Sequence, residues 1–254
     1  TRRSSDLGKG VDTEAGGHFE ECTIEKRPIG VLIQAGGHPV LERCTVRDCG
    51  ESGIEIRGDG RGTIADTTVI DSRYGIGAFD DSNPEVTSCA IKNAYVGILI
   101  SGRSKGTYRR CEISDHATTG IVVAGDGHPL VSACKVHDGK AGGIFIRGGG
   151  AGTFDDCEAW NNGSSGITVA EDAHPTFKGC SAHDNAASGI LVGGQSTPRF
   201  EDCDVRDNQL AGITVNDEAR PFVSGTCFHG GKSCGIFVCK RGAPRFESCE
   251  VWGN

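Results

Sequence analysis

One residue pair recurs along most of the chain: a glycine followed by isoleucine or valine, at intervals of 22 or 23 residues. The glycines of these pairs are Gly30, Gly53, Gly75, Gly97, Gly120, Gly143, Gly166, Gly189, Gly212 and Gly235. Self-similarity at a fixed short period is the signature of a repeat architecture, in which each structural unit stacks on the next. The period therefore constrains the fold more strongly than the composition does.

The repeat unit predicts three short strands. In the segment PRFEDCDVRDNQLAGITV, residues 198–215, Ile213 and Val215 share one face, and Phe200, Cys203 and Val205 supply further inward positions. So short a unit has no room for an ordinary helix and cannot bury a core alone. Stacked units solve both problems, because strands of neighbouring units pair in parallel about 4.8 Å apart.

We therefore predict an all-β fold, a right-handed parallel β-helix of about ten coils. Residues 1–254 are expected to form one domain, part of a longer protein, with residues 1–15 as an irregular or degenerate first coil.

Nine of the thirteen cysteines occur once per repeat. They are Cys22, Cys44, Cys89, Cys111, Cys134, Cys157, Cys180, Cys203 and Cys249, and Thr67 and Thr226 fill the same position in two other repeats. A free cysteine behaves as a small, buryable apolar residue, so we predict an interior column rather than a row of nucleophiles. Unpaired cysteines favour an intracellular location, although secretion is not excluded.

A second column lies four residues after the cysteine position. Its members are Asp48, Asp71, Asn93, Asp115, Asp138, Asn161, Asp184 and Asp207. Carboxylates of this kind serve as catalytic acids in some β-helix enzymes, but an active site needs them in only one or two coils. Recurrence in eight repeats favours a role in turns, where Asp and Asn side chains bond to the backbone.

Composition excludes several classes of function. The formal charge of −8 argues against a dedicated nucleic-acid binder, and no apolar run is long enough to cross a membrane. The sequence has no CxxC pair, the common zinc-ligand spacing, and we predict neither a metal site, nor a cofactor, nor a catalytic constellation.

The residue between the two apolar positions of each GIxV segment is expected to face solvent. From Leu99 onward this position is apolar or β-branched, and we call these residues the first-strand stripe: Leu99, Val122, Phe145, Thr168, Leu191, Thr214 and Phe237. Strand propensity also selects such residues, but a contiguous exposed apolar strip marks a protein interface. The predicted partner-binding residues are Leu99, Val122, Phe145, Leu191 and Phe237.

A different outward column contains rings and cations. It consists of His137, Trp160, His183, Arg206, His229 and Trp252. Indole rings stack on sugars, and aromatic and Arg side chains anchor protein partners. Trp160, Arg206 and Trp252 are therefore candidate ligand-binding residues.

Three segments carry a family resemblance: NPEVTSCAIKN, GGIFIRGGGAGTFDDCEAWNN and HPTFKGCSAHDNAASGILV. They resemble the pectin-lyase-like CASH repeats of carbohydrate-binding proteins and sugar hydrolases, and are most similar to the β-helix domain of certain F-box proteins and their bacterial relatives. The resemblance implies the β-helix fold. It transfers no catalytic residue, because the DPHD motif of alginate epimerases is absent.

Three functional hypotheses follow, and we favour no enzymatic activity. The first is a non-catalytic domain that binds a protein partner through the first-strand stripe. The second is a polysaccharide lyase, epimerase or carbohydrate-binding module, in which Asp80–Asp81, Glu171–Asp172 and Asp217–Glu218 would hold calcium. The third is a structural rod within a larger assembly.

Overall fold

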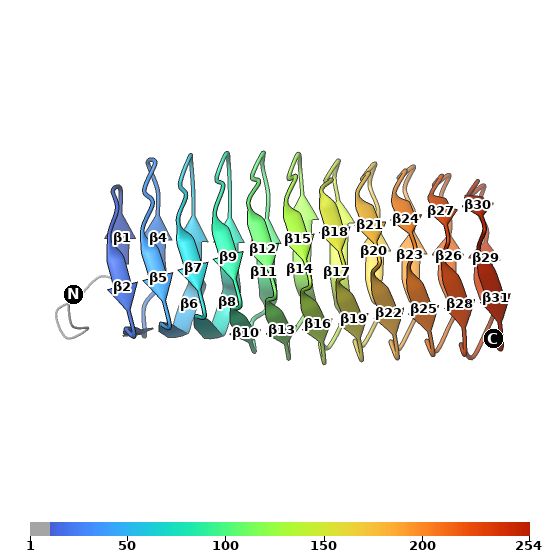
Figure 1. Ribbon diagram of the computed structural model, residues 1–254, viewed down its shortest axis with the longest axis horizontal. Coiled ribbons are helices and arrows are strands. Elements are labelled where there is room, and N and C mark those ends of the chain that lie inside the picture. Colours follow the sequence, from blue (N-terminus) through green and yellow to red (C-terminus); the bar gives the residue numbers. More distant parts are fainter. Residues whose placement is uncertain (1–10) are drawn as a thin grey trace.

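The structure is a computed structural model that describes residues 11–254, and Figure 1 shows it as a straight stack of coils. The described residues form strands and turns and contain no helix. Strands of successive coils pair in parallel, so the predicted all-β solenoid is confirmed. Each coil has three short walls, which we number in the order in which the chain reaches them.

The first wall holds the glycine–isoleucine pairs of the repeat. Its strands are β1 (Val11–Thr13), β4 (Ile29–Ile33), β6 (Thr45–Ile56), β8 (Thr68–Ala78), β11 (Val96–Ile100), β14 (Thr119–Ala124), β17 (Gly142–Arg147), β20 (Ile167–Val169), β23 (Ile190–Val192), β26 (Ile213–Val215) and β29 (Ile236–Val238). The described chain thus has one more coil than the ten glycine pairs indicate, because the Gly10–Val11 pair precedes Gly30 by 20 residues, outside the interval of 22 or 23, while β1 still aligns Val11 with Val31.

Residues 11–13 lie in the segment predicted to be an irregular or degenerate first coil, and they form a regular strand. The remainder of that prediction, residues 1–10, lies outside the described residues.

The second wall is a separate 11-stranded parallel sheet. Its strands are β2 (His18–Glu20), β5 (Val40–Glu42), β7 (Thr63–Ala65), β9 (Glu85–Thr87), β12 (Thr107–Arg109), β15 (Leu130–Ser132), β18 (Thr153–Asp155), β21 (Thr176–Lys178), β24 (Arg199–Glu201), β27 (Phe222–Ser224) and β30 (Arg245–Glu247).

The third wall returns the chain to the first. Its own strands are β3 (Thr23–Glu25), β10 (Ala90–Lys92), β13 (Glu112–Ser114), β16 (Lys135–His137), β19 (Glu158–Trp160), β22 (Ser181–His183), β25 (Asp204–Arg206), β28 (Cys227–His229) and β31 (Glu250–Trp252). β6 and β8 run through both the third and the first wall, which joins these walls into one 20-stranded sheet.

The recurring glycine is required because neighbouring coils approach closely at the start of the first wall. A Cβ atom added at Gly75 would lie 2.6 Å from the carbonyl oxygen of Gly97, and one added at Gly97 would lie 2.5 Å from that of Gly120. Since no side chain fits at these distances, only glycine serves here.

The cysteine column lies inside the solenoid, as predicted. Cys157 is buried, and its Sγ donates to the carbonyl oxygen of Asp155 at 3.4 Å. Thr67 substitutes for a cysteine because its hydroxyl donates to Ala65 in the same way, at 2.9 Å. The thirteen cysteines all lie within residues 11–254, and none forms a disulfide bond. Burial raises the pKa of Cys203 to about 12, so this thiol is unreactive.

The predicted turn column is also confirmed. All eight of its Asp and Asn residues have φ values between 51° and 58°, for example 51° at Asn161 and 58° at Asp115. This left-handed region is open to Asp and Asn at less cost than to most other residues. Their recurrence therefore reflects backbone geometry at the bend between the third and first walls.

An interior asparagine column, which we call the asparagine ladder, follows this bend in the later coils. It comprises Asn162, Asn185 and Asn208, all buried. Oδ1 of Asn185 accepts from the backbone N–H of Asn162 at 3.1 Å, and Nδ2 of Asn185 donates to the carbonyl of Ala159 at 3.0 Å. The ladder thereby satisfies backbone groups that the bend leaves without a strand partner.

Candidate functional site

The first-strand stripe forms one column along the first wall. Leu99, Val122 and Phe145 are register partners in successive strands. Most members are partly exposed and Phe237 is exposed, but Val122 is only 7% exposed. Val122 shares the outward side of the strand with its register partners, but the longer side chains of Leu99 and Phe145 flank it and cover it. The stripe is therefore not a uniform apolar surface.

An open hollow lies where the later part of this stripe meets the bend from the third wall. We call it the corner groove; it has a volume of ≈ 460 Å³, and its lining includes Ser164, Ser188, Leu191, Leu210, Thr214 and Phe237. Two predicted residues, Leu191 and Phe237, thus share a site. Leu99, Val122 and Phe145 are not part of its lining.

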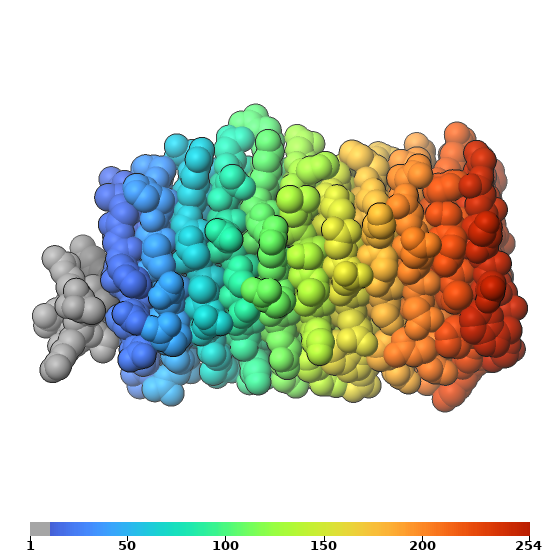
Figure 2. Space-filling view, in the orientation of Figure 1, coloured from blue at the N-terminus to red at the C-terminus, as the bar shows by residue number. Residues whose placement is uncertain are grey.

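The corner groove runs along the rod. Ser164, Ala187 and Leu210 are linked by backbone hydrogen bonds from one coil to the next, of 3.3 and 3.1 Å. Figure 2 shows the coils as successive bands, so a line parallel to the axis crosses equivalent positions of neighbouring coils. The bend residues Ser164, Ser188 and Leu210 were missed in the sequence, where they lie in the variable stretch before each glycine pair.

The lining of the groove combines hydroxyl groups with apolar side chains. The hydroxyls of Ser188 and Thr214 are 2.9 Å apart, and Leu210 is 53% exposed. None of the described residues that line the groove is charged. The described lining therefore offers contacts for binding, and its one titratable side chain is the thiol of Cys234.

Glu55, the charged residue in the same column of the first wall, is held by its neighbours. It is 3% exposed, accepts a hydrogen bond from Ser52 Oγ at 2.7 Å and pairs with Arg57. Its carboxylate therefore stabilises the early coils and does not face a substrate.

The outward column of rings forms two stacks, with Arg206 between them. The ring centroids of His137 and Trp160 are 4.2 Å apart, and those of Trp160 and His183 are 5.9 Å apart, with the planes nearly parallel. Both faces of Trp160 are covered, so the predicted stacking of a sugar on Trp160 is wrong. Trp252 stacks on His229 with one face and stays exposed.

Carboxylates hold this column from both sides. His183 Nε2 lies 2.8 Å from Glu158 and its Nδ1 lies 2.7 Å from Asp184, while Arg206 contacts Ser181 and Asp204 at 2.9 Å. The partner of each histidine on the preceding coil is 25 residues away, which explains why the sequence did not reveal the pairs. The polar groups of the column thus bind one another.

His137 and Asp138 repeat this arrangement two coils before His183 and Asp184. The hydrogen bond from His137, together with one from Asn161, holds the pKa of Asp138 below its usual value.

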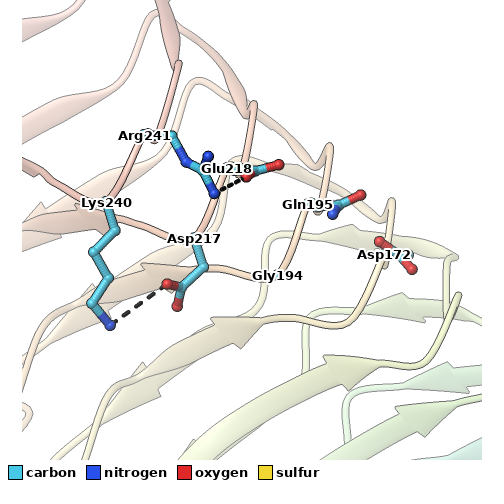
Figure 3. A pocket seen from close by; sticks show the side chains of 7 residues that line it. All are labelled: Asp172, Gly194, Gln195, Asp217, Glu218, Lys240 and Arg241. Carbon is cyan, nitrogen blue, oxygen red and sulfur yellow. Dashed lines mark ion pairs between the residues drawn. The ribbon is translucent and has the colours of Figure 1, made fainter.

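The acidic turns proposed as calcium sites are neutralised by basic residues of neighbouring coils. In Figure 3, Asp217 pairs with Lys240 at 3.5 Å and Glu218 pairs with Arg241. These four residues line a charged hollow of ≈ 480 Å³.

The first acidic turn behaves in the same way. Arg103 binds both carboxylate oxygens of Asp81 at 2.7 Å, and this hydrogen bonding lowers the pKa of Asp81. Over residues 11–254, no group of three or more His, Cys, Asp or Glu side chains is placed to hold a metal ion. The calcium hypothesis is therefore replaced by ion pairs between coils.

The sequence matches the family model described as "Right handed beta helix region" over residues 9–125 and 119–254. The chain belongs to this family. The predicted handedness and the pectin-lyase-like architecture are confirmed, whereas the finer resemblance to F-box proteins stays a prediction. No curated protein matches the sequence significantly.

Solved structures similar to this β-helix include three polysaccharide-modifying proteins. Pectate lyase Pel9A has 15% identity and a TM-score of 0.69, over 100% of this chain and 81% of the lyase. The A-module of the Azotobacter vinelandii mannuronan C-5 epimerase AlgE6 has 12% identity and a TM-score of 0.70, over 97% and 88%. The periplasmic alginate epimerase AlgG has 12% identity and a TM-score of 0.66, over 98% and 80%. Identities this low establish a shared fold.

The cysteines of this β-helix led us to expect an intracellular location for the protein. AlgG is periplasmic, so the fold gives no support to the intracellular location expected from the sequence. Within residues 11–254 there is no helix long and apolar enough to cross a membrane.

Proposed function

We propose that this β-helix binds a polysaccharide chain along the corner groove and does not cleave it. The observation that carries the proposal is an axial groove that combines hydroxyls with apolar side chains and has no charged group in its described lining. The similar structures include enzymes that act on pectate, alginate and mannuronan, which supports a carbohydrate ligand for the shared fold.

The geometry of the groove matches an elongated ligand with a repeating structure. Ser165 and Ser188 occupy equivalent positions of successive coils, so the groove presents serines at about the 4.8 Å spacing of paired strands. A serine or threonine hydroxyl both donates and accepts hydrogen bonds, as sugar hydroxyls do. Leu191 and Phe237 supply apolar surface for the faces of the sugar rings.

An extended peptide fits this groove less well. Peptides that add to a sheet need an unpaired strand edge, and the first-wall strands β23 and β26 are each paired on both sides.

Exposed apolar side chains nevertheless favour a protein partner as the second candidate. Leu210 is more than half exposed and Phe237 is exposed, and such surface marks protein interfaces. Under this alternative the groove binds no polysaccharide, and the variant Phe145→Asp/Phe237→Asp loses the protein partner.

A matched pair of leucine variants tests the proposal. Leu210 in the groove and Leu130 on the second wall are 53% and 52% exposed, so Leu210→Ala and Leu130→Ala remove equivalent side chains from two different surfaces. We expect a panel of neutral and acidic polysaccharides, used in affinity electrophoresis, to retard the wild type and Leu130→Ala, and to retard Leu210→Ala less.

Two results would contradict the proposal. Equal retardation of both variants would place binding elsewhere on the molecule. Formation of unsaturated uronate ends or of epimerised uronate during incubation would show that the protein is an enzyme.

A further inference from the structure

A second hollow lies at the same bend, five to seven coils before the last coil of the corner groove. Its volume is ≈ 590 Å³, and we call it the Tyr95 hollow; it is lined by Asp71, Ser72, Arg73, Asn93, Tyr95 and Ala117. Tyr95 is 53% exposed. Asp71 and Asn93 belong to the turn column identified in the sequence, and the other lining residues form no recognisable sequence motif.

The polar side chains of this hollow are not used within the molecule. Among residues 11–254, the side chains of Asp71 and Asn93 make no hydrogen bond or ion pair, and the described side-chain contact of Arg73 is with the ring of Tyr74, 5.4 Å from its centroid. The equivalent turn residue Asp184, by contrast, binds His183 at 2.7 Å. The Tyr95 hollow therefore keeps hydrogen-bonding groups available for a ligand.

These groups differ in kind from those of the corner groove. An exposed phenol ring offers a flat apolar face with a polar tip. Asp71 accepts hydrogen bonds, Arg73 donates several and Asn93 does both, a set that suits adjacent hydroxyl groups of one ring. Asp71 and Arg73 carry opposite charges, so the hollow has no net formal charge and does not favour an anionic sugar over a neutral one.

The two hollows share one row of bend residues. Backbone hydrogen bonds connect Thr118 to Tyr95 at 3.0 Å and Ser164 to Ala141 at 3.0 Å. Between Tyr95 and Ser164 the row contains Thr118 and Ala141, whose small side chains project little from the surface. Three coils separate Tyr95 from Ser164, about 14 Å at the spacing of paired strands, which one extended oligosaccharide spans.

We infer that the Tyr95 hollow is a second sugar subsite, specific for a neutral pyranose unit of the same polysaccharide. This inference rests on the proposed function and adds the class of sugar to it. Tyr95 stacks on the ring, while Asp71, Arg73 and Asn93 bind its hydroxyl groups.

The test compares polysaccharides and variants in one titration series. The probes are a soluble neutral glucan, a neutral galactomannan, polygalacturonate and alginate. The variants are Tyr95→Ala and Arg73→Ala, with Leu130→Ala and Arg109→Ala as controls. Arg109 is exposed on the second wall and forms no ion pair with another described residue. Because Tyr95 and Arg73 are also exposed, we expect all four variants to fold.

We expect at least one neutral polysaccharide to bind, with affinity roughly tenfold lower for Tyr95→Ala and Arg73→Ala and unchanged for both controls. Binding that is weakened by Leu210→Ala but not by Tyr95→Ala overturns the second subsite and leaves the proposed function standing. Binding restricted to the two polyuronates overturns the neutral specificity. No binding of any probe overturns both the subsite and the proposed function.

Discussion

Replacing Asn185 with alanine removes the central rung of the asparagine ladder. The substitution leaves the buried backbone N–H of Asn162 without its acceptor, which lies 3.1 Å away in the native protein. An orphaned buried donor costs about 1–3 kcal/mol, and each further lost hydrogen bond costs about 0.5–1.5 kcal/mol. Three further bonds disappear, from Asn185 Nδ2 to Ala159 and to Asn208, and from Asn162 Nδ2 to Asn185 Oδ1. We therefore expect a loss of about 3–5 kcal/mol in the free energy of unfolding.

Urea denaturation followed by circular dichroism measures this loss. Gln209→Ala is the control, because Gln209 is exposed and its side chain makes no hydrogen bond with another described residue. Exposed substitutions of this kind change stability by about 0.5 kcal/mol or less. The transition slope should match that of the wild type, since a changed slope would indicate loss of cooperativity between coils.

A loss below about 1 kcal/mol for Asn185→Ala, at an unchanged slope, would refute the reasoning. It would mean that water or a shifted backbone replaces the asparagine at the bend, and that the ladder is not needed to satisfy Asn162.

Three further predictions concern packing, thiols and pH. Gly97→Ala should destabilise the protein strongly, because its Cβ would lie 2.5 Å from a carbonyl oxygen of the next coil; a melting temperature equal to that of the wild type would contradict this. Iodoacetamide should alkylate exposed Cys234 in the groove and spare buried Cys203, as mass spectrometry of peptides can show, and a bound polysaccharide should slow alkylation of Cys234. The lowered pKa of Asp138 implies stabilisation that is present above its unfolded pKa and is lost as pH falls through its folded pKa. Asp138→Asn should therefore lower stability at pH 6 and have little effect near pH 2, and an equal loss at both pH values would contradict the assignment.

The fold was predictable because successive coils have the same structural requirements and therefore the same residues. Each coil needs the same close approach at its glycine and the same buried group at the bend, so Gly97 and Cys157 recur at the repeat interval. The Gly10–Val11 pair lies 20 residues before the next pair, outside the repeat interval, so the coil that contains Val11 escaped the count.

The ladder and the ring column were less visible for a different reason. Asn185 and its neighbours occupy only three successive coils, next to a turn column of similar residues. The partner of His183 on the preceding coil, Glu158, is 25 residues away. An interaction between coils joins different positions of two repeats, and alignment of the repeats places those positions in separate columns.

In a solenoid, a polar cluster is a binding site only where its groups are not already bound to one another. The ring column has many polar atoms, but His183 is held by two carboxylates. The charged turns are similar, because Asp217 pairs with Lys240 on the next coil. Both clusters recur, and recurrence lets each coil satisfy the next. At the Tyr95 hollow, the residues that align with the ring column are an isoleucine and a lysine rather than histidines, so Asp71 and Asn93 have no histidine to bind. The local break in the repeat is what leaves hydrogen-bonding groups free, and it is there that a ligand gains the most by binding.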